Sequence, residues 1–142
     1  MKWLKSPVVV VSIFLGTMQA QAKTLVISDV DDTIKISYVR SKMEMVSFSA
    51  FADSLFFAMN DVYQELEQKA KRSGEDMKFY YLSNGFTPTV EEVHTKVLRD
   101  FDFPKGRYIS RPNPLVKTHK LDHIRRLINI EKPERVIFIG DN

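Results

Sequence analysis

The chain has 142 residues, enough for one domain with one hydrophobic core. It contains no cysteine, which excludes disulfide frameworks, thiol catalysis and cysteine-type zinc sites. Lys and Arg number 21 against 18 Asp and Glu, so the net charge of +3 is too small to argue for nucleic-acid binding.

The first 22 residues have the pattern of a secretory signal peptide. Lys2 and Lys5 form a basic start, residues 8–15 are apolar, and residues 20–22 read Ala-Gln-Ala, a small-residue cleavage pattern. The apolar run is shorter than the ~20 residues of a transmembrane helix. We therefore predict cleavage after Ala22 and an exported chain, periplasmic or secreted, with one domain over residues 23–142. An uncleaved membrane anchor is the alternative.

Three carboxylates follow the first apolar run of that domain. Residues 25–27 predict a buried strand, which leads into Asp29, Asp31 and Asp32. Like charges this close repel one another, so the pattern indicates a cation among them, and Mg²⁺ prefers such oxygen ligands. At a strand end Asp29 is suited to attack phosphorus and Asp31 to act as general acid and base. An acidic turn or a helix N-cap is the structural alternative.

Residues 35–45 place apolar side chains at alternate positions and suggest a hairpin. Apolar residues from 48 to 66 then recur at helical spacing, which predicts a long helix ending near Gly74. The aromatic side chains in this stretch are assigned to core packing.

A second apolar strand, residues 79–82, ends at Ser83, Asn84 and a glycine. Such a turn can present a hydroxyl and backbone N–H groups to a phosphate, although an ordinary turn has the same composition. Thr87 and Pro88 then predict the start of a second helix. Its inward face is expected at positions 90, 93, 97 and 101, followed by a short strand at positions 107–110.

A third helix is predicted after Thr118, a residue suited to the N-cap. Lys120 falls in its first turn, where a cation opposes the helix dipole, and this mismatch is a hint of function. Lys117 is the competing lysine, while His119 and His123 are predicted to be solvated. The predicted inward face consists of Leu121, Ile124, Leu127 and Ile128.

The last apolar run, residues 135–139, ends at Gly140 and Asp141, one residue before the end of the given sequence. Strands and helices therefore alternate along the whole chain. Such alternation predicts an α/β fold with a doubly wound parallel sheet.

The motifs together resemble those of the haloacid dehalogenase-like (HAD) phosphatase superfamily. Residues 29–34 read Asp-Val-Asp-Asp-Thr-Ile and resemble motif I, and Ser83, Lys120 and Asp141 fall at motifs II, III and IV in order. The Asp-x-Asp-Asp-Thr form is similar to that of the branch containing the lipins and the actin-patch-associated phosphatidate phosphatases. The resemblance extends over residues 24–142.

The resemblance implies a HAD-like core with a small flap over residues 35–45 and no large cap domain. It also implies that the C-terminal part is missing, because the family has a further acidic residue, strand and helix after motif IV. The metal ligands it implies for Mg²⁺ are Asp29, the Asp31 backbone carbonyl and Asp141. The phosphate-binding residues it implies are Ser83, Asn84 and Lys120.

The expected activity is Mg²⁺-dependent hydrolysis of a phosphomonoester through a phosphorylated Asp29. By resemblance, the substrate is phosphatidate or a related phospholipid at a membrane surface, which an uncapped site would admit. One alternative is a phosphatase for soluble phosphomonoesters or phosphoproteins. A second is an inactive module that only binds a phosphorylated ligand. The oligomeric state is not predicted.

Overall fold

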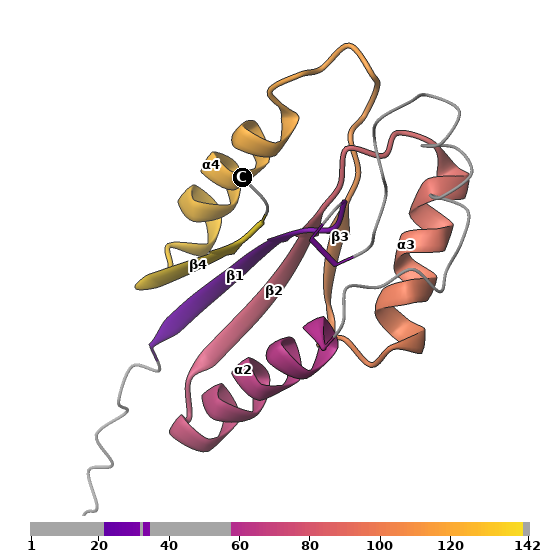
Figure 1. Cartoon of the computed structure of the whole chain (residues 1–142). Coiled ribbons are helices and arrows are strands. Elements are labelled where there is room, and N and C mark those ends of the chain that lie inside the picture. The colour runs from indigo at the N-terminus through magenta and orange to yellow at the C-terminus, as the bar shows by residue number, and fades with distance from the viewer. Residues whose placement is uncertain (1–21, 32, 35–57, 141–142) are drawn as a thin grey trace, which may run out of the picture.

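Four parallel strands form one open sheet in the described part of the computed structural model of this chain (Figure 1). The structure describes residues 22–31, 33–34 and 58–140. Its strands are β1 (Lys23–Asp29), β2 (Asp76–Leu82), β3 (Gly106–Ile109) and β4 (Arg135–Ile139). Its helices are α2 (Met59–Ser73), α3 (Pro88–Asp100) and α4 (His119–Glu131). The predicted α/β class with a parallel, Rossmann-like doubly wound sheet is confirmed.

The strand order β3-β2-β1-β4 places the first strand inside the sheet. From β1 the chain steps through β2 to β3, and α4 then returns it to the opposite side of β1. The winding direction therefore reverses between β1 and β4. In open α/β sheets, ligands bind outside the carboxyl ends of the strands at such a reversal. Asp29, the last residue of β1, lies at this point.

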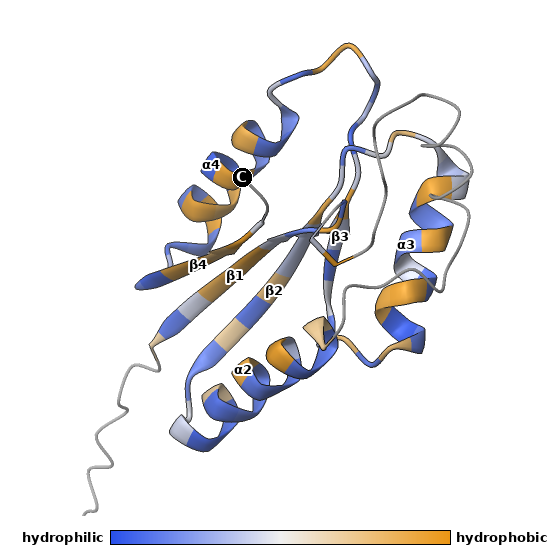
Figure 2. Ribbon diagram, viewed as in Figure 1, coloured by the Kyte–Doolittle hydropathy of each residue, from blue (hydrophilic) through white to orange (hydrophobic). Residues whose placement is uncertain are grey.

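Different helices cover the two faces of the sheet. Tyr63 of α2 and Leu98 of α3 pack on the face that includes Val26, whereas Leu127 of α4 packs on the face that includes Leu25. Neighbouring residues of a strand point to opposite faces, so β1 and β2 are buried on both sides. This explains their continuous apolar sequences, and Figure 2 shows the hydrophobic colour along the middle of β1.

Helix-end signals decide where two of the helices begin and end. The Thr87 hydroxyl accepts a hydrogen bond from the backbone N–H of Val90, and Pro88 opens α3 as predicted. Gly74 ends α2 with a φ of 68°, a left-handed conformation that costs glycine little. The predicted long helix is thus confirmed at its C-terminal end, while residues 48–57 lie outside the described part.

Three local predictions need correction. The short strand begins at Gly106, one residue earlier than expected. Leu121 is 47 % exposed, because α4 turns this position away from the sheet. Thr118 occupies the N-cap position of α4 as predicted, but its hydroxyl donates to the Asp122 carboxylate instead of accepting a hydrogen bond from a backbone N–H of the first turn.

The predicted signal peptide, except for its last residue, and the predicted flap lie outside the described residues. Within the described part, no helix is both long enough and apolar enough to span a bilayer.

Candidate active site

The carboxyl edge of the sheet brings together four residues predicted from three motifs that lie far apart in the sequence. Asp29 ends β1, Asp31 follows two residues later, and Ser83 comes directly after β2. Lys120 reaches the same place from the first turn of α4. The parallel sheet alone explains why β1 and β2 deliver their polar residues together, since both strands end at this edge.

An ion pair joins the nucleophile candidate to the lysine. Lys120 Nζ lies 2.6 Å from Asp29 Oδ2, and both side chains are mostly covered. Burial raises the pKa of Asp29, the hydrogen bond and charge of Lys120 oppose that rise, and the charge of Asp31 adds to it. Lys120 therefore provides the positive charge that allows a carboxylate to persist here.

The second oxygen of Asp29 has a different environment. Oδ1 is buried and makes no hydrogen bond to any part of the chain that the structure describes. A buried carboxylate oxygen without a donor is costly unless another group occupies its lone pairs. This oxygen fits a hard cation such as Mg²⁺, which takes carboxylate ligands.

Asp31 is held by the turn that follows β2. Its Oδ2 accepts hydrogen bonds from the Ser83 hydroxyl at 2.9 Å and from the Asn84 backbone N–H at 2.7 Å. The Gly85 N–H in turn donates to Ser83 Oγ at 2.9 Å. Ser83 and Asn84, two of the three residues predicted to bind phosphate, thus lie beside the predicted acid/base and donate hydrogen bonds to it in this structure.

A buried histidine next to Asp31 was missed by the sequence analysis. His94 of α3 is fully buried, with Nε2 3.8 Å from Asp31 Oδ1 and Nδ1 3.0 Å from the Tyr108 hydroxyl of β3. The signal was available, because His94 lies four residues after Val90 and three before Val97, on the inward face of the helix. A polar residue on that face indicates a hydrogen-bonding partner inside the protein.

The prediction that His119 is solvated is wrong. Its side chain is 2 % exposed, and Nε2–H donates to the Ser83 backbone carbonyl at 2.9 Å. Burial lowers the pKa of His119, which favours the neutral ring. Its contact fixes the start of α4 against the turn after β2, one residue from Lys120. His123 is half-buried.

The buried hydroxyls of Ser28 and Tyr63 fix the backbone at Asp29. Ser28 Oγ donates to the backbone carbonyl of Asp29 at 2.8 Å and lies 2.5 Å from the Tyr63 hydroxyl of α2. Burial raises the pKa of Tyr63 to about 12, so this hydroxyl keeps its proton. With Ser28 donating to the carbonyl, Tyr63 donates to Ser28 Oγ, and α2 is linked to the end of β1.

Of the two candidate lysines, only Lys120 lies at the site. The predicted metal ligands are only partly covered by the described residues. Lys117 is exposed at the surface, while Lys120 contacts Asp29. Among the described residues no three acidic, histidine or cysteine side chains form a metal-binding group. Asp32 and Asp141 are not among those residues, so the predicted contribution of Asp141 remains a prediction.

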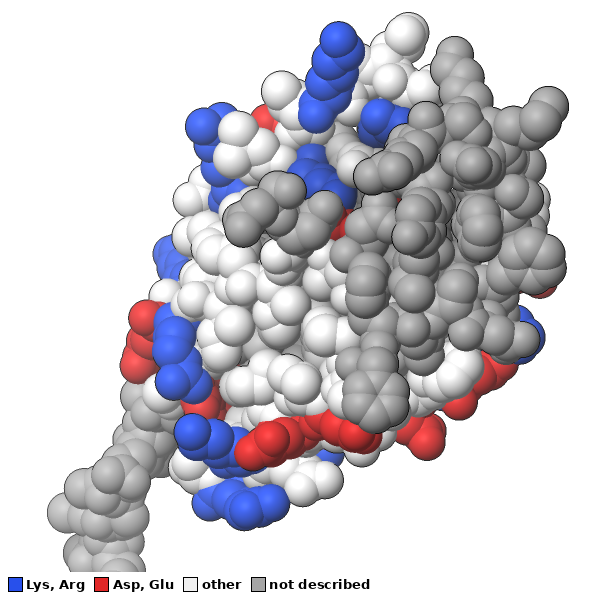
Figure 3. Space-filling model, viewed as in Figure 1, with Lys and Arg blue, Asp and Glu red and all other residues white. Residues whose placement is uncertain are grey.

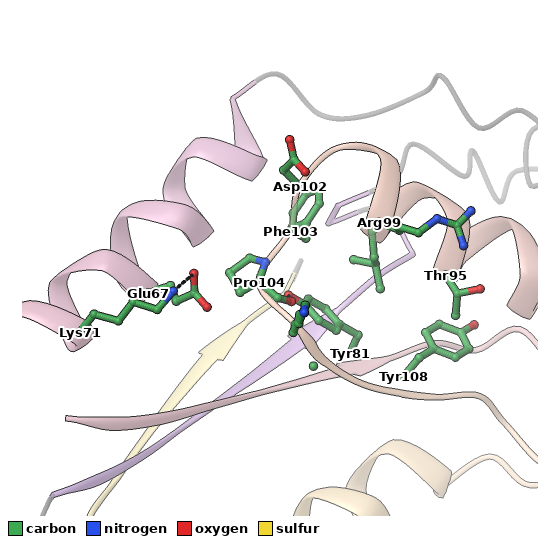
Figure 4. Close-up of a pocket in the computed structure, with 12 residues that line it drawn as sticks. Glu67, Lys71, Tyr81, Thr95, Arg99, Asp102, Phe103, Pro104 and Tyr108 are labelled. Atoms are coloured by element: carbon green, nitrogen blue, oxygen red, sulfur yellow. Dashed lines mark hydrogen bonds and ion pairs between the residues drawn. The ribbon is translucent and has the colours of Figure 1, made fainter. Parts of the chain in front are cut away.

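One cleft of the described region lies away from these residues. It has a volume of about 850 Å³ and lies between α2 and α3, beside the start of β3. Figure 4 shows Glu67 and Lys71 of α2 on one side of it, joined by an ion pair, and Arg99 on the other. None of the four converging site residues lines it. The site at the carboxyl edge is therefore separate from this cleft.

Fold and site together define an α/β protein with a carboxylate–lysine site at the carboxyl edge of a parallel sheet. Residues 24–142 match the family model described as "Phosphatidate phosphatase APP1, catalytic domain", and the chain belongs to this family. The resemblance drawn from the motifs is thereby confirmed. Neither the curated proteins nor the solved structures include a significant match.

Proposed function

We propose that this protein is a Mg²⁺-dependent phosphatase that hydrolyses phosphomonoesters, with phosphatidate or a related phospholipid as its substrate. Family membership supports phosphatidate phosphatase-like activity. The observation that supports the chemistry is the partly buried ion pair between Asp29 and Lys120, with Asp31 oriented two residues away. This is the arrangement that a carboxylate nucleophile with its own acid/base requires.

In the first half-reaction, the Asp29 carboxylate attacks phosphorus. A bond forms between Asp29 and phosphorus as the bond from phosphorus to the alcohol oxygen breaks, and Asp31 gives its proton to that oxygen. In the second half-reaction, Asp31 takes a proton from water, and the water oxygen attacks phosphorus to release phosphate and free Asp29. Both transfers use the same carboxyl group in opposite directions.

Phosphate charge requires cationic and N–H donors around it. Lys120 is already at the site, and the Ser83 hydroxyl and Asn84 N–H lie beside Asp31, where they can exchange to phosphoryl oxygens. We assign Mg²⁺ binding to Asp29, the Asp31 backbone carbonyl and Asp141. When bound, Mg²⁺ supplies further positive charge for the phosphoryl oxygens.

The test is phosphate release from phosphatidate vesicles and from a soluble aryl phosphate. Release should require Mg²⁺, stop with EDTA, and fall to background in Asp29→Asn. Asp31→Asn should lose roughly 10²–10⁴-fold on the lipid, the usual contribution of general acid–base catalysis. Asp100→Asn, an exposed carboxylate on α3, is the matched control. Full activity in Asp29→Asn would refute the proposal.

The same assay separates the alternative functions. A preference for vesicles over the aryl phosphate selects a lipid substrate, while equal or higher activity on the soluble ester selects a phosphatase for soluble compounds. Binding of a phosphate analogue without release from either substrate selects an inactive binding module.

We also propose that the protein is exported after cleavage following Ala22. Support comes from the sequence pattern and from the start of β1 at Lys23, since cleavage there leaves the whole strand in place. Cleavage would remove one hydrogen bond, because the backbone N–H of Asp76 donates to the backbone carbonyl of Ala22. N-terminal sequencing of the exported protein should begin at Lys23, and an N-terminus at Met1 would contradict cleavage.

A further inference from the structure

The segment between β3 and α4, residues 110–118, carries an apolar side chain that the fold leaves in solvent. Leu115 is 87 % exposed, the highest value among the large hydrophobic residues of the described part. Figure 2 shows the hydrophobic colour at the tip of this loop, which extends beyond the carboxyl edge of the sheet. The loop leads into the first turn of α4 and hence to Lys120.

Local structure keeps Leu115 in this position. Pro112 and Pro114 restrict the backbone on its N-terminal side. The Leu115 N–H donates to Asn113 Oδ1 at 2.9 Å, and the Val116 N–H donates to the Asn113 carbonyl at 3.3 Å. This turn is held by its own hydrogen bonds, so presenting Leu115 requires little further loss of conformational entropy.

A second exposed apolar residue lies on the neighbouring turn. Phe86 is 42 % exposed, and the Arg111 guanidinium carbon lies 5.6 Å from the centre of its ring. In addition, the backbone N–H of Arg111 donates to the backbone carbonyl of Gly85 at 2.9 Å. These contacts tie the loop to the turn that holds Asp31, so both apolar residues belong to the rim of the candidate active site.

The loop 110–118 and the neighbouring turn carry only positive charge. Residues 110–118 contain Arg111 and Lys117 and no acidic residue, and residues 83–87 contain no charge. The nearest carboxylates that bond to the loop are those of Glu91, which accepts from Ser110, and Asp122, which accepts from Thr118. On the face drawn in Figure 3, blue side chains predominate at this end of the molecule, whereas red and blue side chains lie together at the opposite end.

We propose that this rim, formed by Phe86, Arg111, Leu115 and Lys117, docks the protein on the surface of an anionic phospholipid bilayer. Apolar side chains flanked by cations suit the membrane interface, because the former enter the acyl boundary and the latter contact lipid phosphates. Docking there would bring Asp29 and Lys120 to headgroup level. This consequence for turnover rests on the proposed function, while the binding itself does not.

Vesicle co-sedimentation of the mature chain, without Mg²⁺, tests the docking directly. Binding should be stronger to phosphatidylcholine vesicles that contain phosphatidylserine than to pure phosphatidylcholine. Leu115→Ser should weaken binding about tenfold, since it removes one leucine from the bilayer. Ile130→Ser, at an exposed aliphatic residue near the C-terminal end of α4, should change it less than about twofold.

A second pair of variants tests the charge. Lys117→Gln should weaken binding only to the phosphatidylserine-containing vesicles, and the difference should shrink with added salt. Lys69→Gln, an exposed lysine on α2, is the control and should leave binding unchanged. Equal effects of the two lysine variants would overturn the proposed orientation on the membrane.

The outcomes keep the two proposals apart. Leu115→Ser should lower hydrolysis of vesicle phosphatidate while leaving hydrolysis of a soluble aryl phosphate unchanged. Absence of vesicle binding, or unchanged binding by Leu115→Ser, would overturn the docking surface even if the enzyme is active. Vesicle binding that needs Leu115 in a protein without phosphatase activity would support docking and refute the proposed function. Equal loss on both substrates would assign Leu115 to the fold and contradict docking.

Discussion

At the scale of single residues, the candidate site depends on one partly buried ion pair. Lys120 lies 2.6 Å from Asp29 and offsets the rise that burial causes in the pKa of that carboxyl. Removing one partner of such a pair leaves the other charge without compensation in a partly desolvated environment. The lysine therefore has two roles, stabilising the free carboxylate and then contacting the phosphate.

Substitution of the two neighbouring lysines separates site chemistry from surface charge. Lys120→Gln should lower kcat/KM for a soluble aryl phosphate by about 10²–10³-fold, the range for loss of one electrostatic stabiliser. Lys117→Gln should stay near wild type on the same substrate, because its side chain is exposed and lies off the Asp29 contact. The reverse order of effects would assign the functional lysine to Lys117.

At the scale of secondary-structure elements, one carboxylate holds three elements together. Glu131, at the end of α4, accepts hydrogen bonds from Lys23 of β1 and from Lys78 and Tyr80 of β2. The bonds from Lys78, Tyr80 and Lys23, in that order of importance, lower the pKa of Glu131 to about 2. Because the folded pKa lies below the ordinary value of 4.5, this group stabilises the fold above about pH 4.5 and stops doing so as pH falls towards 2.

Glu131→Gln should therefore reduce stability most at neutral pH. We expect a loss of ~1–2 kcal/mol in the free energy of unfolding at pH 7, less than the full pKa shift implies because the two lysines are partly solvated. The decline in stability between pH 4.5 and 2 should become shallower in the variant. Denaturant unfolding at several pH values measures both effects, with exposed Glu134→Gln as control. Parallel pH curves for wild type and Glu131→Gln would contradict the assignment.

The pairing of β3 with β2 requires a residue without a side chain at Gly106. A Cβ there would lie 2.5 Å from the Phe79 carbonyl oxygen and 2.7 Å from Tyr81 Cε2. Gly106→Ala should lower the free energy of unfolding by ~1–3 kcal/mol through overpacking. At Gly140 the nearest atom to a Cβ is 3.7 Å away, so Gly140→Ala should stay within ~0.5 kcal/mol. Equal unfolding midpoints for the two variants would show that β3 can shift at little cost.

At the scale of the whole molecule, the parallel sheet could be predicted from the sequence because its strands and helices are specified by local sequence signals. The apolar strands, the Thr87–Pro88 helix start and the Gly74 helix end all act through neighbouring residues. The parallel sheet then explains why Asp29 and Ser83 meet, since each follows a strand that ends at the same edge.

The parts that could not be predicted depend on packing between distant elements. Leu121 and His119 lie two residues apart on α4, yet the leucine is half-exposed and the histidine is buried. Helical spacing alone cannot give this result, because the buried arc is set by how α4 lies against the turn after β2. The partnership of His94 with Tyr108, and the choice of Lys120 over Lys117, likewise follow from tertiary contacts.

The proposed mechanism requires that Asp29 becomes phosphorylated during turnover. Asp31→Asn with a soluble aryl phosphate is the most direct test, because an aryl leaving group needs little protonation while release of the intermediate still needs the base. Acid quenching, borohydride reduction and mass spectrometry of the peptide should find homoserine at position 29, only when substrate and Mg²⁺ were both present. Reduction at another carboxylate, or none at position 29 while the wild-type enzyme turns over normally, would contradict the mechanism.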